Sequence, residues 1–248
     1  MSRLRDQVTT VNSLPERDEE LLLSVVIPVY NEEETLAELV ERVESIDLPK
    51  EIVLVDDGST DGSLKILDEL ETRDGIRVFR HEQNQGKGAA LRTGFNHCEG
   101  EVVLIQDADL EYDPHDYPRL LKPFAEAGAD VVYGSRFLVG EYARVHLFYH
   151  YMGNRFLTFL SNVATGLNLT DMETCYKVFR REILDGIEIR SKRFAVEPEL
   201  TAKIARKKVR IFEVPIRYAG RNYSEGKKIT WRDGVAALWA IIYYRFND

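Results

Sequence analysis

Acidic residues at alternate positions follow an apolar run near the middle of the chain. Residues 102–105 (VVLI) have the composition of a strand buried on both faces, and residues 106–111 (QDADLE) follow directly. Alternate residues of extended backbone point the same way, so Asp107 and Asp109 are expected to face one side, with Glu111 continuing the row. Converging carboxylates repel one another unless a cation lies between them, and Mg2+ typically takes one or two carboxylates together with substrate phosphates and water. The pattern predicts Mg2+ or Mn2+ holding a phosphorylated substrate; the alternative is a solvated acidic turn.

Strands and helices alternate around this row in the first half of the chain. Strands are expected at 22–29, 51–55, 76–79, 101–106 and 130–134, and helices at 33–43, 61–70, 87–97 and 116–127. This alternation is typical of right-handed βαβ crossovers and predicts an α/β fold with a mainly parallel sheet flanked by helices. In such sheets ligands bind beyond the carboxyl ends of the strands, where the acidic row is expected.

The second half of the chain is less regular. We expect an aromatic-rich helix at 147–163, a short helix and turn at 180–190, a helix at 197–207, a strand at 209–218 and a final helix at 230–246. Pro215 can donate no ladder bond, which makes the strand at 209–218 an edge strand. The polar residues 1–20 are expected to form a flexible extension before a main domain at 21–229, with a C-terminal amphipathic helix at 230–248.

Composition excludes several classes of protein. The 248 residues are 44% hydrophobic with a net charge of -9, which argues against a nucleic-acid partner. Cys98 and Cys175 have neither zinc-ligand spacing nor a disulfide framework, which favours a reducing compartment. The N-terminus lacks the apolar core of a signal peptide, and no apolar run is long enough to span a bilayer. We expect a cytoplasmic protein, either soluble or peripherally associated with a membrane.

The ends of the first two predicted strands are also acidic. Asn31 and Glu34 have the spacing of an N-cap pair, and the three acids at 32–34 would repel a pyrophosphate, which argues against a dinucleotide-binding fold. After the second strand, Gly58 permits a tight turn, and residues 59–61 can cap the next helix. Of Asp56 and Asp57, one is left over to accept hydrogen bonds from a ribose or a base; the alternative makes both of them turn and cap residues.

Two further motifs are incomplete. Gly86-Lys87-Gly88 opens a predicted helix but lacks the P-loop spacing, so it is interpreted as a packing turn. The acidic row could also begin a calcium-binding EF-hand loop, but Tyr112 and Pro118 stand where that loop requires Gly and Glu.

Four segments together carry a resemblance to a known family. Residues 28–32 (PVYNE), 55–59 (VDDGS), 106–109 (QDAD) and 134–137 (GSRF) resemble family 2 inverting glycosyltransferases of the GT-A fold. Within that family the chain looks closest to dolichyl- and polyprenyl-phosphate hexosyltransferases, the dolichol-phosphate mannose synthase group, from about Leu22 to about Ile229. The resemblance implies metal-dependent transfer of a hexose from a GDP- or UDP-sugar to a membrane-borne polyprenyl phosphate.

The resemblance also implies roles for individual residues. A nucleoside pocket would be lined by Pro28, Tyr30, Glu32, Val55 and Asp57. Metal and diphosphate would be held by Asp107 and Asp109, with Ala108 beside them and Glu111 in a position usually filled by Gln. The basic contacts to phosphate would be Arg136, Arg221 and Lys227. Asp109 and these three basic residues form the implied catalytic set. The segment from Asp171 to Arg180 would line the acceptor side, where Thr174-Cys175 replaces the common Ser-Gly.

Basic residues gather late in this acidic chain. Residues 203–210 are interpreted as a solvated helix face and strand edge, whereas 221–228 has the composition of a flexible basic loop suited to closing over a diphosphate. The last helix carries a stripe that comprises Trp231, Val235, Leu238, Trp239, Ile242, Tyr243 and Phe246. We expect this stripe to pack on its own domain; the alternatives are an interfacial helix at a membrane surface, or contact with a second copy or a membrane-protein partner.

The chemistry of the acceptor decides whether a general base is needed. A phosphate monoester has a second pKa of about 6 and can attack without a strong protein base, whereas a hydroxyl acceptor requires one, with Asp171 or Glu173 as the candidates. Two alternative functions remain: a glycosyltransferase with a sugar-hydroxyl acceptor, and a non-catalytic nucleotide-sugar-binding or membrane-binding module. Turnover with polyprenyl phosphate, turnover with hydroxyl acceptors, and absence of turnover distinguish the three.

Overall fold

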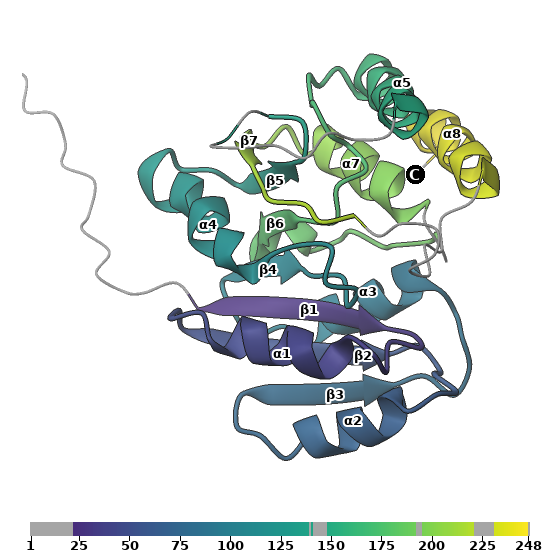
Figure 1. Cartoon of the computed structure of the whole chain (residues 1–248). Coiled ribbons are helices and arrows are strands. Elements are labelled where there is room, and N and C mark those ends of the chain that lie inside the picture. The colour runs from purple at the N-terminus through teal and green to yellow at the C-terminus, as the bar shows by residue number, and fades with distance from the viewer. Residues whose placement is uncertain (1–21, 139, 141–147, 192–194, 221–230, 248) are drawn as a thin grey trace, which may run out of the picture.

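The computed structural model describes residues 22–138, 140, 148–191, 195–220 and 231–247 (Figure 1). The strands are β1 Leu23–Val29, β2 Lys50–Asp56, β3 Ile76–Arg80, β4 Val102–Ile105, β5 Val131–Ser135, β6 Lys177–Arg180 and β7 Ile211–Pro215. The helices are α1 Leu36–Glu44, α2 Ser63–Leu70, α3 Lys87–Asn96, η1 Pro114–Asp116, α4 Tyr117–Glu126, α5 Phe148–Thr165, α6 Arg181–Leu184, α7 Val196–Arg206 and α8 Trp231–Phe246. The predicted α/β class is confirmed, and most predicted elements lie within a few residues of the observed ones.

The strands form one seven-stranded sheet in the order β3-β2-β1-β4-β6-β5-β7. Neighbouring strands are parallel except where β6 pairs antiparallel with β4 and β5. Every residue of β4 is fully buried, as its apolar sequence predicts. Helices α1, α2 and α3 flank the β1–β3 half, while α5, α7 and α8 form a helical layer beyond the other half (Figure 1).

Strand β6 was not predicted from the sequence. Of its four residues, KVFR, only Arg180 was assigned to an element, the helix and turn expected at 180–190. It forms because Val178 and Phe179 complete the ladder between β4 and β5, and because Lys177 is buried as the ion-pair partner of Glu197. Because β6 runs opposite to its neighbours, the residues that precede it, 171–176, lie at the edge where the other strands end.

The C-terminal helix packs through a different face from the predicted one. Its buried side chains include those of Ala237, Ala240, Ile241 and Tyr244, and α8 contacts α5 and α7. Small alanines allow close approach to α7, so the large apolar side chains turn outward: Val235, Trp239, Ile242 and Phe246 are 56%, 59%, 57% and 80% exposed. For these four residues, the prediction that the stripe packs on its own domain is wrong.

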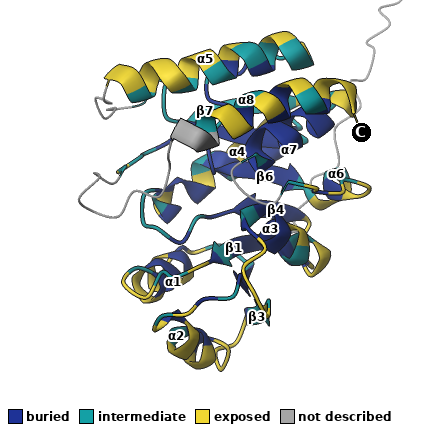
Figure 2. Cartoon of the chain, turned by 90° about the vertical axis from the view of Figure 1, so that its right-hand side faces the viewer, coloured by how far each residue is buried: buried dark blue, intermediate teal, exposed yellow. Residues whose placement is uncertain are grey.

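Helix α5 lies beside α8 and is exposed in the same way (Figure 2). Its exposed side chains include Phe148, Tyr149, Met152, Phe156, Phe159 and Val163. The two helices together form an apolar surface, here called the α5–α8 surface, on the side of the molecule away from α2. Among the described residues, no helix is both long and apolar enough to cross a membrane.

The basic segment 203–210 is not uniformly solvated as predicted. Lys203 is buried, with its ammonium 2.9 Å from Glu199, and it donates to the backbone oxygen of Glu188. Arg210 does remain at the surface, where it pairs with Asp130. The ion pair between Lys203 and Glu199 of α7 explains the difference, since a lysine can be buried where a carboxylate compensates its charge.

Glycine at position 94 controls how closely α3 packs on the sheet. A Cβ at Gly94 would lie 2.3 Å from Cγ1 of Val26 in β1, whereas a Cβ at Gly153 of α5 would meet nothing within 4 Å. We predict that Gly94→Ala lowers the free energy of unfolding by about 1–3 kcal/mol through overpacking. Gly153→Ala, the matched control, raises it by roughly 0.5–1 kcal/mol because alanine favours a helix. Urea denaturation of the two variants measures both; equal stabilities for them would contradict the packing argument.

Candidate functional site

The carboxyl edge of the sheet gathers the residues that the sequence singled out. Tyr30 and Glu32 follow β1, Asp57 follows β2, Asp107 and Asp109 follow β4, and Arg136 follows β5. All four strands are parallel in direction, so their carboxyl ends meet at one edge. The reversal of β6 adds Asp171 and its neighbours from the opposite chain direction. The sheet thus brings together two carboxylates, an arginine and the predicted acceptor segment.

Asp107 is held by a lysine that the sequence analysis interpreted as part of a packing turn. The Lys87 ammonium lies 2.8 Å from Oδ1 of Asp107 and 3.1 Å from Oε1 of Glu197. Glu197 in turn pairs with the buried Lys177. Burial alone would lower the pKa of Lys87, but the charges of Asp107 and Glu197 outweigh it and hold that pKa well above its usual value. Acid and base therefore alternate along a row from Asp107 through Lys87 and Glu197 to Lys177, here called the charge row.

The position of Lys87 at the site could have been found from the sequence. Helix α3 follows β3 and begins at the carboxyl edge, as helices after parallel strands do. A lysine in its first turn, Lys87, is therefore positioned toward the site even without a P-loop. Glu197 and Lys177 gave no comparable signal, because their pairing depends on the position of β6.

Buried tyrosines fix the backbone that carries Asp107. The Gln106 side-chain amide donates to the Asp107 carbonyl at 2.9 Å. Its oxygen accepts from the hydroxyls of Tyr117 at 2.8 Å and Tyr176 at 2.7 Å. Tyr112 accepts from the backbone N–H of Cys175 at 3.1 Å. The strand end is thereby held from β4, α4 and the segment before β6 together.

The acidic row turns away after Asp109. Oδ1 of Asp109 accepts from the backbone N–H of Glu111 at 3.1 Å, and Leu110 has a left-handed φ of 59°. Glu111 instead accepts from the Tyr218 hydroxyl at 2.7 Å through Oε2. Within the part of the chain that the structure describes, no three His, Cys, Asp or Glu side chains form a cluster that could hold a metal. Of the predicted row, Glu111 is thus bonded to Tyr218, and Asp107 and Asp109 are the two carboxylates nearest in sequence to the end of β4.

The loops after β1 and β2 are bound to each other. Asn31, with φ of 52°, donates its backbone N–H to the Ser59 hydroxyl at 3.0 Å and accepts from the backbone N–H of Thr60 at 2.8 Å. The predicted N-cap pair of Asn31 and Glu34 is wrong, because α1 begins later, after Thr35, and Asn31 is used between loops. Tyr30 is 40% exposed beside this junction. Pro28, Glu32 and Val55 complete the predicted nucleoside-side positions, with Val55 buried and the other two partly exposed.

Asp57 supports the turn that precedes α3. Its buried carboxylate accepts from the backbone N–H groups of Gln85 at 2.9 Å and Gly86 at 2.7 Å, and its Oδ1 lies 2.8 Å from Nδ1 of His81. The adjacent Asp56 accepts from Ser59 N–H at 3.1 Å. Asp57 therefore links the predicted nucleoside side to the segment that carries Lys87.

Arg136 forms the other ion pair of the site. Its Nε and Nη2 each lie 2.7 Å from an oxygen of Asp171, whose side chain is fully buried, and its backbone N–H donates to the same carboxylate at 3.0 Å. Burial opposes the charged guanidinium, but Asp171 outweighs this and keeps the pKa of Arg136 well above its ordinary value. The Tyr218 ring lies 5.1 Å from the guanidinium carbon. Asp171 is thus occupied with holding Arg136 in place.

Glu173 differs from Asp171, since the described residues give it no such partner. Its Oε1 is buried and has no hydrogen-bond partner, although the residue as a whole is partly exposed. Burial, reinforced by the negative charge of Glu197, raises the pKa of Glu173 to about 7, despite opposing effects from Lys177 and Arg136. A carboxyl group in this state can exchange a proton near neutral pH.

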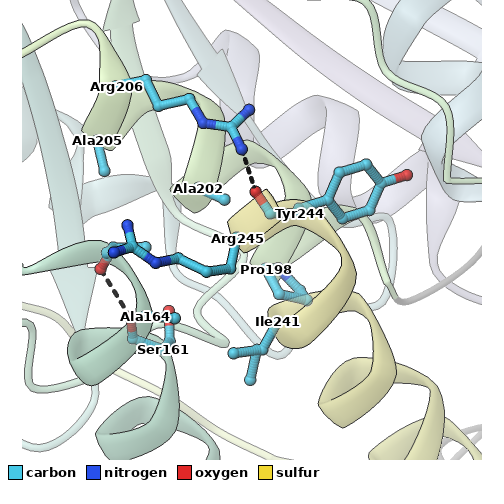
Figure 3. Close-up of a pocket in the computed structure, with 10 residues that line it drawn as sticks. Ser161, Ala164, Pro198, Ala202, Ala205, Arg206, Ile241, Tyr244 and Arg245 are labelled. Atoms are coloured by element: carbon cyan, nitrogen blue, oxygen red, sulfur yellow. Dashed lines mark hydrogen bonds between the residues drawn. The ribbon is translucent and has the colours of Figure 1, made fainter. Parts of the chain in front are cut away.

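A cavity of about 190 Å³ lies elsewhere, between α5, α7 and α8 (Figure 3). Its walls include Ala164, Pro198, Ala202 and Ile241, with Arg206 at its side donating to the backbone oxygen of Tyr244. None of its lining residues belongs to the strand ends described above. The cavity is a gap in the helical layer and not the candidate site. The predicted site residues Arg221 and Lys227, and the basic loop that contains them, lie outside the described residues.

This arrangement defines an α/β protein whose charged and polar side chains gather at the carboxyl edge of the sheet. Residues 24–187 match glycosyl transferase family 2. The chain belongs to glycosyl transferase family 2, as the sequence motifs predicted.

Proteins of known name resemble the chain over most of its length. It is 35% identical over 211 residues to the undecaprenyl-phosphate 4-deoxy-4-formamido-L-arabinose transferase of Edwardsiella ictaluri and 34% identical over 212 residues to that of Proteus mirabilis. Each alignment covers 83% of this chain and 62% of the relative, so the chain spans less than two thirds of these proteins' length.

Solved structures share the fold at lower identity. Glucosyl-3-phosphoglycerate synthase from Mycobacterium tuberculosis, in complex with Mn2+, UDP and phosphoglyceric acid, aligns with a TM-score of 0.68 and 19% identity, covering 92% of this chain and 80% of that one. The same enzyme with Mn2+, UDP and glucosyl-3-phosphoglycerate gives 0.66, covering 90% and 80%. The predicted GT-A fold is confirmed.

The bonds of Asp57 lead to a stability prediction. Asp57→Ala leaves the N–H groups of Gln85 and Gly86 without their acceptor, and that of Gly86 is buried. We expect a loss of about 1–3 kcal/mol in the free energy of unfolding, together with weaker nucleotide binding because the turn before Lys87 is released. Urea denaturation and calorimetry with UDP and GDP measure the two effects. Asp74→Ala, at an exposed carboxylate, is the control; a variant as stable as this control would contradict the supporting role.

Proposed function

We propose that this chain is an inverting glycosyltransferase that transfers a hexose from a nucleoside-diphosphate sugar to a polyprenyl phosphate. The observation that carries the proposal is the Asp107–Asp109 pair at the end of β4, in a chain 35% identical over 211 residues to an undecaprenyl-phosphate sugar transferase. The name of that relative specifies a formamido-arabinose, so the sugar and the choice between GDP and UDP are questions for a donor panel.

The donor set suits a divalent cation. Asp107 and Asp109 offer carboxylate oxygens from one strand end, and Mg2+ or Mn2+ accepts one or two such ligands when substrate phosphates supply the others. Solved structures of the same fold contain Mn2+ together with UDP, which supports the assignment. We propose that these two aspartates hold the metal, with Ala108 beside them. Glu111 would act on the site indirectly, through the hydrogen bond that it accepts from the Tyr218 hydroxyl. When bound, the ion would offset charge on the leaving diphosphate.

The protein's own cations have the same role. Arg136 is already oriented by Asp171, and that pairing uses two of the five N–H groups of its guanidinium, so the remaining N–H groups can approach a phosphate. Lys87 lies beside Asp107 and adds a second fixed positive charge. We propose that Arg221 and Lys227 complete the set. Fixed charges aimed at the leaving group lower the barrier because they need no reorganisation during the reaction.

A phosphate acceptor does not require either of the two candidate general bases, Asp171 and Glu173. The Asp171 carboxylate accepts three hydrogen bonds from Arg136, so it is poorly suited to removing a proton. A phosphate monoester is largely dianionic at neutral pH, its second pKa being about 6, and needs no such group. The segment 171–176 would then contribute to acceptor binding rather than to proton removal.

An acceptor with a lipid chain implies that the enzyme acts at a membrane surface. We propose that the α5–α8 surface contacts the bilayer, because its exposed side chains are aromatic and apolar, as in helices that lie at the headgroup level. Burying one such side chain contributes about 1.5–3 kcal/mol. The cations of 227–232, which precede and begin α8 in sequence, would add attraction to anionic lipids.

Activity tests the proposal directly. We predict release of nucleoside diphosphate and formation of glycosyl polyprenyl phosphate with one member of a panel of UDP- and GDP-hexoses and the nucleotide-linked formamido-arabinose, in the presence of Mg2+ or Mn2+. Asp109→Ala should reduce turnover by at least about 10³-fold, since metal charge stabilisation is worth several kcal/mol and about 1.4 kcal/mol corresponds to tenfold.

Controls separate this function from its alternatives. Asp185→Ala, at an exposed carboxylate of the α6 end, should retain wild-type turnover. Transfer only to sugar hydroxyls would replace the proposed acceptor, and absence of transfer to any acceptor would favour a binding module. Full activity of Asp109→Ala with unchanged metal dependence would reject the metal assignment.

Vesicle binding tests the membrane contact. We predict that Phe156→Ser combined with Trp239→Ser weakens co-sedimentation with anionic vesicles by at least about tenfold, because two exposed apolar side chains no longer enter the bilayer. Added salt should weaken wild-type binding further. The matched control is Leu64→Ser, which removes an exposed leucine from α2, at the far end of the molecule (Figure 2). Equal binding by the two variants would assign the α5–α8 surface to a partner protein or a second copy.

A further inference from the structure

Glu173 stands apart from the other charged groups at the carboxyl edge. The Arg136–Asp171 pair and the charge row each contain cations and anions in contact. Glu173 lies in the field of both groups, but no hydrogen bond or ion pair joins it to either. Among the described residues, Glu173 is therefore a carboxyl group of the site that no ion pair neutralises.

The surroundings of Glu173 favour its neutral form. Asp171, on the same segment, and Glu197, from α7, disfavour a further negative charge nearby. Lys177 of β6 and Arg136 after β5 oppose them, but each is already paired with an acid. Buried oxygen Oε1, without a donor, makes ionisation costlier still. The result is the pKa of about 7 described above.

A neutral carboxyl group has one capacity that a carboxylate lacks, which is to donate a hydrogen bond. In Glu173 the unpartnered Oε1 is buried while the residue keeps partial exposure, so the proton is best carried on the other oxygen, Oε2. A donor there suits an acceptor phosphate, whose oxygens accept hydrogen bonds and whose negative charge an ionised Glu173 would repel.

We propose that Glu173 is an acceptor-binding residue that donates a hydrogen bond to the acceptor's phosphate while protonated and excludes that phosphate when ionised. The inference rests on the proposed function and specifies how its site recognises the acceptor. The affinity for the acceptor should then fall as the pH rises above 7, because the acceptor binds only when Glu173 carries its proton. The dianion of the acceptor forms above about pH 6, so productive binding is confined to a window near neutrality.

Acceptor binding by the full-length protein tests the inference. Farnesyl phosphate, a short prenyl phosphate, is titrated into wild type and Glu173→Gln between pH 6.5 and 8.5 by calorimetry, and its KM is measured with the active donor. Wild-type affinity should fall above pH 7 with a limiting slope of about tenfold per pH unit, the value for one linked proton. Glu173→Gln keeps a donor that does not titrate, so its affinity should be nearly constant. Glu173→Ala, which lacks the donor, should bind weakly at pH 6.5.

Folding of the variants has its own readout. The pKa of Glu173 in the folded protein exceeds its ordinary value of 4.5, so ionisation costs stability as pH rises from 4.5 to about 7. Glu173→Gln should therefore melt at a higher temperature than wild type at pH 8 but not at pH 5.

Inorganic phosphate, used as a competitor, should show the wild-type pH dependence if the phosphate group itself is recognised. Competition that does not vary with pH would overturn the inference.

Three further results would overturn the inference. One is a wild-type alkaline fall in affinity that persists in Glu173→Gln. Another is loss of kcat in that variant with an unchanged acceptor KM, which would indicate a general base acting on a hydroxyl. The third is equal melting temperatures of the two proteins at pH 8. Absence of wild-type transfer to any polyprenyl phosphate would instead be a failure of the proposed function.

Discussion

Acidic side chains that gather at the sheet edge must be paired with cations, and the rest of the structure depends on this constraint. Parallel strands deliver acids to one place, and Asp107 is tolerable there because Lys87 lies against it. Lys87 requires Glu197, and Glu197 requires Lys177 at the start of β6. A reversed strand in the middle of the sheet is therefore part of the electrostatics of the site as well as of its backbone.

Two cations of the site, Arg136 and Lys87, meet the same constraint with different partners. Arg136 forms a two-point pair with a fully buried aspartate, which fixes the plane of its guanidinium. Lys87 is shared between two carboxylates and can shift between them without losing a charged neighbour. A rigid cation and an adaptable one at a single edge suit a ligand whose charge distribution changes during a reaction.

The sequence predicted the strands whose pattern is local. Apolar runs such as residues 102–105, together with the turns that follow them, specified the parallel part of the sheet, and the paired motifs specified the family. Strand β6 was missed because its four residues acquire a strand environment only from β4 and β5. The role of Lys87 was missed for a related reason, since its partners are 20 and 110 positions away in sequence. Trp239 points outward because the alanines of α8 pack on the other side, against α7. Periodicity alone does not predict which face of the helix is buried.

The two outer strands of the sheet differ in how they end the ladder. Strand β7 closes with Pro215, whose nitrogen carries no hydrogen, and β3 carries Arg77 and Arg80, which are tied by ion pairs to Glu51 and Asp68. Charged and proline-bearing edges discourage the addition of strands from another molecule. Self-association through continuous sheets is therefore disfavoured at both margins, even at high local concentration. Contacts through helices, such as the α5–α8 surface, avoid this restriction.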